Sequence, residues 1–315
     1  MKLSKAIEGY LLFANTKYAP DTVRHYQDTL RNVISHLGDP EIENISAEVL
    51  QKYFHYLKTE HKPHRFRAPG ETATLMGDAG VEGYWKALRS LFKWSEEALR
   101  TSRPDKAIPQ PKYQLDMIKA FTREEIEKLI YHAEWTNRID TASKKTHRLH
   151  RPTYKRDVAL IKFLLDTGLR LGEVCRVKNR DVDLQTGAVI VAPYGTGQKT
   201  KPRTVYLGKS STHSLWVYLA EKDLQKEDSL FGSKGKTIRR LIKSIGDKAG
   251  VQDCHPHRFR HTFAIEFLRN QKDPYMLMRL LGHSNMEMTK HYLDIVEDDL
   301  RRVHGTASPV DKMIL

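Results

Sequence analysis

Cysteine is scarce in this sequence, and long apolar runs are lacking. The 315 residues contain only Cys175 and Cys254, far apart and in no CxxC arrangement, which argues against a disulfide framework or a cysteine-based zinc site. No run approaches the roughly 18 apolar residues of a membrane span. Residues 1–10 carry neither an apolar signal region nor a small-residue cleavage pattern. We therefore expect a cytoplasmic protein with no membrane partner, in which both thiols pack as small buried side chains.

Acidic residues are also few relative to basic ones. The chain has 53 Lys and Arg against 39 Asp and Glu, a net charge of +14 and a pI near 9.6. Such a field attracts polyanions, and nucleic acid is the commonest of these. Many basic proteins bind no nucleic acid, however, so charge alone favours this partner only slightly. The 39% hydrophobic content indicates a globular chain, and its length suits two domains.

The first hundred residues carry a helical pattern. Apolar residues recur at helical spacing between Pro20 and Gly38, and Ser46 is placed to cap the next helix. Residues 58–81 break the pattern and are expected to form a loop. A further helix would then bury the apolar residues Trp85, Leu88, Leu91 and Phe92. Its other face carries Lys86, Arg89 and Lys93, which suit phosphate contacts or, equally well, a solvated helix face.

The composition changes near residue 103. Prolines and the absence of a helical period predict a semi-rigid linker over 103–117, between a helical domain over 1–102 and a second domain over 118–315. Thr122 and Glu125 form a capping box for the first helix of that second domain. A basic loop follows that either clamps DNA or is solvated; its cations are Lys144, Lys145, Arg148, Arg151, Lys155 and Arg156.

One hairpin is expected in the second domain. Residues 188–191 and 204–207 are short β-rich runs that flank a polar, glycine-containing turn. The remaining segments have helical spacing, so the predicted fold class is mainly α with a small antiparallel sheet. Lys199 and Lys201 extend from the hairpin tip. A lysine there can enter a site when substrate binds, although most such lysines are simply solvated.

Arg170 occupies a predicted junction between two helices. Gly168 is placed to end one helix and Gly172 to open the next, so a guanidinium between them can be held rigidly. Considered alone, Arg170 is better interpreted as a buried structural arginine paired with Glu173 or Asp181.

A second group of candidates follows Pro256, which suits the first turn of a helix. His257 and Arg260 then lie three residues apart on one helix face. His257 and His261 have the spacing of a metal site, but no acidic ligand accompanies them and the adjacent arginines would repel a cation. We expect no metal here, and we expect His261 to pack or to make a structural hydrogen bond.

The last candidates are His283 and Tyr292. Gly282 is placed to end one helix, and Ser284 with Glu287 to form the capping box of the next, which puts His283 at another junction. Tyr292 would lie two turns along that helix and, considered alone, would be a core aromatic residue.

In combination these segments resemble the tyrosine recombinase (phage integrase) family. The matching motifs are Thr-Gly-Leu-Arg170-x-x-Glu173, then His257-x-x-Arg260-His261-Thr-Phe-Ala, and Leu-Gly-His283 followed nine residues later by Tyr292. Gly172 stands where the family often has serine. The resemblance spans essentially the whole chain. It implies an N-terminal helical core-binding domain and a C-terminal catalytic domain, without an arm-binding domain.

The resemblance also implies roles for these residues. Tyr292 would be the nucleophile that forms a 3′-phosphotyrosyl intermediate, Arg170 and Arg260 would grip the phosphate, and Lys199 would be the general acid, with Lys201 as a competitor. His257 and His283 would donate hydrogen bonds and assist proton transfer. A phenol with a pKa near 10 needs such nearby positive charge to be a nucleophile, and the transition state gains negative charge that fixed cations stabilise, so no cofactor is expected.

The expected partner is duplex DNA with paired inverted-repeat core sites. The resemblance implies a homotetramer on this DNA, in which the C-terminal tail packs on a neighbouring protomer, and a nucleoid-associated protein that integrates or excises a mobile element. A type IB topoisomerase-like enzyme and a non-catalytic DNA-binding regulator on the same scaffold remain alternatives. The presence of all six catalytic candidates argues against the regulator.

Overall fold

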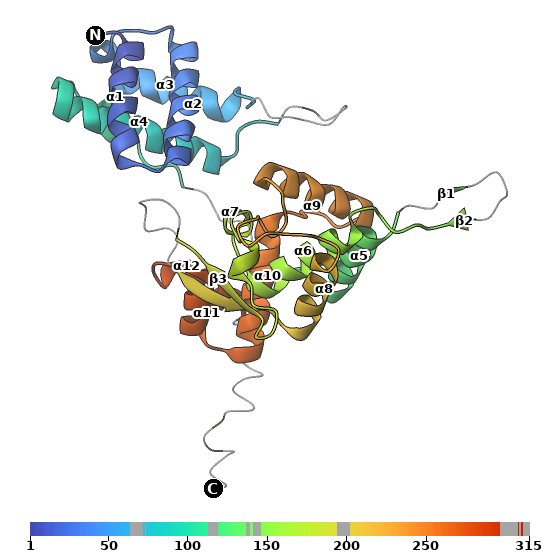
Figure 1. The fold of residues 1–315 in the computed structure, drawn as a ribbon. Coiled ribbons are helices and arrows are strands. Elements are labelled where there is room, and N and C mark those ends of the chain that lie inside the picture. The colour runs from blue at the N-terminus through green and yellow to red at the C-terminus, as the bar shows by residue number, and fades with distance from the viewer. Residues whose placement is uncertain are drawn as a thin grey trace. The chain divides into compact units, whose positions relative to one another are not determined.

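The computed structural model describes residues 1–63, 72, 74–112, 119–136, 139–140, 146–193, 202–296, 308 and 310. The chain divides into two compact units (Figure 1). The first contains helices α1 to α4 with the short helices η1 and η2, and the second contains α5 to α12, η3 and the strands. The described residues are mostly helical with a small antiparallel sheet, so the predicted fold class is confirmed. Within them, no helix is long and apolar enough to cross a bilayer.

The first unit is a bundle whose helix ends follow local sequence signals. Its elements are α1 (Leu3–Lys17), α2 (Pro20–Leu37), η1 (Ile42–Asn44), α3 (Ala47–Thr59), α4 (Asp78–Leu99) and η2 (Pro104–Ala107). Pro20 opens α2, and Gly38 closes it with a left-handed φ of 75°. The Ser46 side chain accepts a hydrogen bond from the Val49 amide and so caps α3. These three predicted signals are confirmed.

Two boundaries of the first unit differ from the sequence prediction. The predicted loop over 58–81 is shorter, because α3 extends through Thr59 and α4 begins at Asp78, after Gly77 in an extended conformation. Helix η2 packs on α3 and α4 although it falls in the predicted linker. Ile108 is buried in the core of this unit, and its carbonyl accepts a hydrogen bond of 3.0 Å from the half-buried Trp85 side chain. Apolar contacts thus order a segment whose prolines suggested a linker.

The second unit is built around α6. Its helices are α5 (Arg123–Glu134), α6 (Tyr154–Thr167), α7 (Leu171–Val174), η3 (Asn179–Asp181), α8 (Lys209–Leu219), α9 (Gly235–Ala249), α10 (Pro256–Gln271), α11 (Pro274–Leu281) and α12 (Glu287–Val296). Helix α6 contacts α5, α8 and α10, and it buries Leu160, Phe163 and Leu164. The predicted capping box of Thr122 and Glu125 at the start of α5 is present.

The strands of the second unit form two hairpins. β3 (Ala188–Val191) pairs with β4 (Arg203–Tyr206), and their inward residues join the core, so the predicted hairpin is confirmed within one residue. Its tip, 194–201, lies outside the described residues. The second hairpin, β1 (Ile139–Asp140) with β2 (Thr146–His147), was not predicted. Strands of two residues are too short to show an alternating pattern.

The two cysteines differ in burial. Cys254 is buried, and burial raises the pKa of its thiol to about 11. Cys175 is only half-buried, which departs from the sequence expectation of two buried thiols. Burial also raises its pKa, so both thiols are neutral at physiological pH.

Candidate active site

Arg170 lies at the junction that the sequence predicted. Gly168 ends α6 with a left-handed φ of 59°, and Arg170 is the extended residue before α7. Its amide donates to Glu173 Oε2 at 2.8 Å, whereas its Nη1 lies 3.7 Å from Glu173 Oε1. Nη1 is buried and has no hydrogen-bond partner among the residues that the structure describes. A buried donor without a hydrogen-bond partner costs folding free energy, and an acceptor from outside the chain would remove that cost.

Arg260 of α10 has its guanidinium fixed by three hydrogen-bond acceptors. Only 3% of the residue is exposed. Its Nη1 donates to the Gly168 carbonyl at 2.8 Å, and its Nη2 donates to the Leu281 carbonyl at 2.9 Å and to His283 Nε2 at 2.8 Å. Burial lowers its pKa to about 10, so the guanidinium remains charged at neutral pH. These contacts join α10 to the ends of α6 and α11.

His283 follows Gly282, which ends α11 with a left-handed φ of 65°. Since arginine only donates, His283 Nε2 must accept the hydrogen bond from Arg260. Its Nδ1 lies 2.9 Å from Thr289 Oγ1 and carries the ring proton. Burial, followed by the charge of Arg260, lowers the pKa of His283 to about 4. The family resemblance implied that His283 donates; in this structure its Nε2 accepts.

The turn between His283 and α12 differs in detail from the sequence prediction. The helix begins at Glu287, two residues later than a Ser284 cap would place it. The side chain that accepts from its first turn is Asn285, whose Oδ1 lies 3.4 Å from the Met288 amide. Asparagine is an equally good cap, and the sequence pattern did not distinguish the two.

Tyr292 lies in the second turn of α12, and only 4% of it is exposed. Its hydroxyl is 3.0 Å from His261 Nδ1 on α10. Burial lowers the pKa of His261 to about 4, so the ring is neutral and its Nδ1 accepts from the phenol. Burial raises the pKa of Tyr292, while the charges of Arg260 and Arg170 oppose that rise. The phenol is therefore neutral at rest, beside positive charge.

The sequence candidates are only partly assembled among the described residues. Arg170, Arg260, His283 and Tyr292 meet at the ends of α6, α10, α11 and α12. His257 is exposed one turn before His261, with 5.9 Å between their ring centroids, and the charges of Arg260 and Arg170 act on its ring. Lys199 and Lys201 lie outside the described residues. Within the described part of the chain, no cluster of three His, Cys, Asp or Glu could hold a metal ion.

Sequence reasoning missed Arg203, the first residue of β4. Its guanidinium donates to both carboxylate oxygens of Glu173, at 3.0 and 2.9 Å, and its Nε donates to the Leu280 carbonyl at 2.7 Å. The only signal available in the sequence was its place at the base of the hairpin, directly after the tip lysines. Its partners are 30 and 77 residues away, so no local pattern identifies them.

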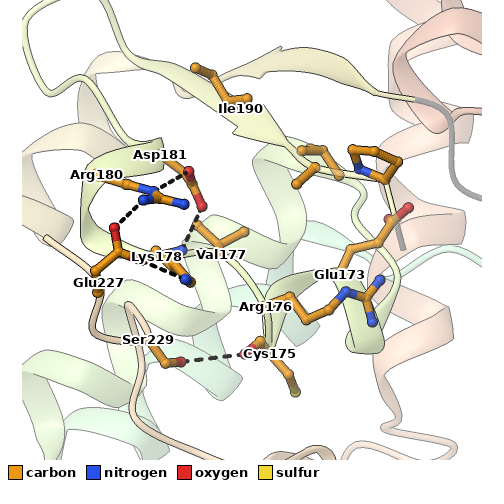
Figure 2. Close-up of a pocket in the computed structure, with 13 residues that line it drawn as sticks. Glu173, Cys175, Arg176, Val177, Lys178, Arg180, Asp181, Ile190, Glu227 and Ser229 are labelled. Carbon is orange, nitrogen blue, oxygen red and sulfur yellow. Dashed lines mark hydrogen bonds and ion pairs between the residues drawn. The ribbon is translucent and has the colours of Figure 1, made fainter. Parts of the chain in front are cut away.

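Glu173 also forms part of the wall of a pocket of about 440 Å³ beside β3 (Figure 2). Most charges there are already paired: Lys178 Nζ lies 2.6 Å from Glu227 Oε2, and Arg180 bonds the other oxygen of the same carboxylate. These cations differ from Arg170, whose Nη1 has no hydrogen-bond partner among the described residues.

The predicted DNA contacts are exposed where the structure describes them. Lys86, Arg89 and Lys93 all face solvent on α4. Lys86 pairs with Glu82 at 2.7 Å, and Arg89 lies over the Trp85 ring at 4.9 Å. Arg148 lies 5.2 Å from the Tyr131 ring centroid. Lys144 and Lys145 lie outside the described residues.

Comparison with known proteins identifies the family of this chain. The sequence profile described as "Phage integrase family" matches residues 119–298. Tyrosine recombinase XerA of Thermococcus kodakarensis is 29% identical over 240 residues, covering 73% of this chain and 75% of that protein. Tyrosine recombinase XerC of Staphylococcus epidermidis is 29% identical over 311 residues, covering 95% of each. The lambda integrase tetramer bound to a Holliday junction is 16% identical, with a TM-score of 0.68 over 93% of this chain and 77% of that one, which shows a shared fold.

Proposed function

This chain belongs to the phage integrase family and is a site-specific tyrosine recombinase, and from that premise we propose that Tyr292 is its nucleophile. The Tyr292 hydroxyl gives its proton to its hydrogen-bond partner, His261 Nδ1, and its oxygen attacks the phosphorus of a backbone phosphodiester. The displaced 5′ oxygen takes up a proton from the general acid. The 3′-phosphotyrosyl bond conserves the energy of the broken bond. A 5′ hydroxyl of another strand then attacks this bond and restores the phenol, so rejoining needs no ATP.

The observation that carries this proposal is the buried Nη1 of Arg170, which has no hydrogen-bond partner among the described residues and lies near the charged Arg260. We assign to these two guanidinium groups the non-bridging oxygens of the scissile phosphate, because their forked donors fit its geometry. The transition state concentrates negative charge on those oxygens, and fixed cations stabilise it more than the ground state. The same charges favour the phenolate form of Tyr292.

The three histidines receive different tasks under this proposal. His261 accepts the hydrogen bond of the resting phenol and holds its ring beside the arginines. His257, exposed on the same helix, donates to a phosphate oxygen. His283 first orients Arg260. The bound phosphate anion then favours the protonated His283 ring, which can donate from both nitrogens.

The general acid comes from the hairpin tip. Lys199 fits the family pattern best and would protonate the leaving 5′ oxygen, and Lys201 is its competitor. Both follow β3 and precede β4, and Arg203 of β4 contacts the Arg170 junction through Glu173. The hairpin base is thus anchored at the site from which such a lysine would act.

We propose duplex DNA with paired inverted-repeat core sites as the substrate, bound by a homotetramer. The core-binding domain would include the predicted 1–102 together with the first part of the predicted 103–117 linker, because η2 and Ile108 pack on it. Residues 118–315 would be the catalytic domain, with a tail that packs on a neighbouring protomer. The net charge of +14 and the exposed cations of α4 support DNA binding. The recombinase would act on nucleoid DNA and integrate or excise a mobile element.

The test begins with binding sites selected from random duplex DNA by the protein itself. A nicked duplex carrying the selected site lets the cleaved end diffuse away and traps any covalent adduct for a denaturing gel. We expect an adduct with the natural protein and none with Tyr292→Phe, which should bind the site equally well. An adduct that survives Tyr292→Phe would refute the assignment. Replacing Lys199 or Lys201 by alanine should slow cleavage in only one of the two variants, and supercoiled DNA lacking the site should not be relaxed.

A further inference from the structure

Arg203 and Arg170 both approach the carboxylate of Glu173, at different distances. The two oxygens of Glu173 lie 3.0 and 2.9 Å from the Arg203 guanidinium, within hydrogen-bond range. Arg170 Nη1 lies 3.7 Å from the nearer oxygen, which is an ion pair without a hydrogen bond. We propose that Arg203 is a positioning residue that occupies Glu173 and thereby leaves the Arg170 guanidinium available to the scissile phosphate. This inference rests on the phosphate-binding role proposed for Arg170.

The Glu173 carboxylate has little remaining capacity to accept. It takes two hydrogen bonds from Arg203 and a third, of 2.8 Å, from the Arg170 amide. A carboxylate offers about four acceptor positions, so a tight bond to the Arg170 side chain would have to compete for the last of them. Burial opposes ionisation of Glu173, but the hydrogen bonds and charge of Arg203 hold its pKa below the ordinary value. The carboxylate is therefore charged, and Arg203 is its principal counterion.

Arg203 is fixed in place by the ends of two other elements. Its Nε donates to the Leu280 carbonyl in the last turn of α11 at 2.7 Å. Gly282 follows that turn with a left-handed φ, and a Cβ there would lie 2.8 Å from Arg203 Nη1. The glycine thus supplies both the backbone turn and the room for the guanidinium. Through these contacts Arg203 joins β4, the start of α7 and the segment that leads to His283.

Removal of Arg203 would leave a buried carboxylate without its main counterion. Such a charge is strongly destabilising unless another cation approaches. The ion pair already formed at 3.7 Å makes Arg170 that cation. Once drawn onto Glu173, Arg170 would have its charge neutralised and its donors occupied, and the phosphate would lose one of its two guanidinium partners.

This competition predicts rescue by a second substitution. Arg203→Met keeps much of the side-chain volume but removes the charge. We expect it to slow single-turnover cleavage of the nicked duplex on the order of 100-fold, which is typical when one donor to a transition-state anion is lost. DNA affinity, set by many other phosphate contacts, should change by about twofold or less. Adding Glu173→Gln removes the charge that captures Arg170, and cleavage should recover about tenfold.

The matched control is Arg180→Met. Arg180 belongs to another arginine–glutamate pair of the same unit, but it bonds Glu227 at the surface, with 52% of its side chain exposed. Its replacement should leave the cleavage rate unchanged. If Arg203 serves only to hold the fold, the double variant will be slower than Arg203→Met, and that result overturns the inference.

Two further comparisons keep the outcome decisive. If circular dichroism shows that Arg203→Met does not fold, Arg203→Lys is tested in its place, with and without Glu173→Gln. Lysine retains the charge but not the forked donors of arginine. We therefore expect an intermediate loss of cleavage rate, which Glu173→Gln should again partly restore. Loss of rescue in that pair also overturns the inference. A Tyr292-dependent adduct without rescue refutes this inference alone, whereas absence of a Tyr292-dependent adduct refutes the proposed function itself.

Discussion

The Tyr292 hydroxyl and the His261 ring form a hydrogen bond of 3.0 Å between α12 and α10. Because burial lowers the pKa of His261 to about 4, its ring is a neutral acceptor at physiological pH. The resting phenol is therefore kept protonated and oriented while Arg260 and Arg170 lie near it. Activation then requires the phenol to lose this proton, which the charges of Arg260 and Arg170 favour.

A double-mutant cycle should detect this hydrogen bond as a coupling energy. His261→Ala and Tyr292→Phe each remove one partner and leave the other buried, so each should lower the free energy of unfolding by about 1–3 kcal/mol. The double variant should lose less than the sum, by about 0.5–1.5 kcal/mol. Urea denaturation followed by circular dichroism provides the measurement. Strictly additive losses would show that the two side chains do not interact.

Acid should destabilise the second unit in a defined pH window. His261 and His283 each have a folded pKa of about 4, against an ordinary value of 6.5. Between these values the unfolded chain binds more protons than the folded one, so stability is complete above pH 6.5 and is lost as the pH falls toward 4. Thermal unfolding midpoints measured across this range should therefore fall with pH. His261→Asn should make the decline shallower, and an unchanged slope would contradict the assigned pKa.

A methyl group at Gly168 should disturb the site more than the same change elsewhere. Gly168 has a φ of +59°, and a Cβ there would meet Phe263 Cδ1 at 2.4 Å. Its carbonyl also accepts from Arg260. Gly168→Ala combines left-handed strain of about 1–2 kcal/mol with overpacking of about 1–3 kcal/mol. Gly232→Ala, at φ +56° with nothing within 4 Å, carries the strain alone and serves as the control. Equal losses of unfolding free energy would exclude the predicted collision.

The exposed cations of α4 should control the salt dependence of DNA binding if residues 1–102 form the core-binding domain. Lys93→Gln removes one phosphate contact, which should reduce the slope of log affinity against log salt concentration by about 1 without changing the preferred site. Lys86 is paired with Glu82, so Lys86→Gln should reduce it less. Lys52 of α3, paired with Glu48, provides a control. Fluorescence anisotropy over a salt series gives the slopes; identical slopes for all four proteins would exclude this face.

The sequence predicted what depends on neighbouring residues. Helix ends at Pro20, Gly38, Thr122 and Gly282 follow from local backbone preferences and caps, and the structure confirms them. Contacts between distant segments were not visible. The partnership of His261 with Tyr292 spans 31 residues, and the contact of Arg203 with Leu280 spans 77. Those contacts are set by the packing of α10, α11 and β4, which no periodicity encodes.

Local signals also failed where packing outweighs them. Prolines predicted a linker from residue 103, but Ile108 is buried in the first unit and accepts a hydrogen bond from Trp85. Ser284 was the expected cap of α12, yet Asn285 takes that place, since both residues can accept from the helix start. In each case the sequence allowed two structures, and tertiary contacts selected one.

The three acceptors around Arg260 bear on whether an incompletely folded chain could cleave DNA in a cell. The carbonyls of Gly168 and Leu281 and the ring of His283 come from segments up to 115 residues apart, and they converge only when the unit is fully folded. A nascent or damaged chain would still contain the tyrosine but would lack the electrostatic surroundings assigned to it. Under the proposed mechanism such a chain cannot break the genome it touches, because competence to cut arises in the same step as the native fold.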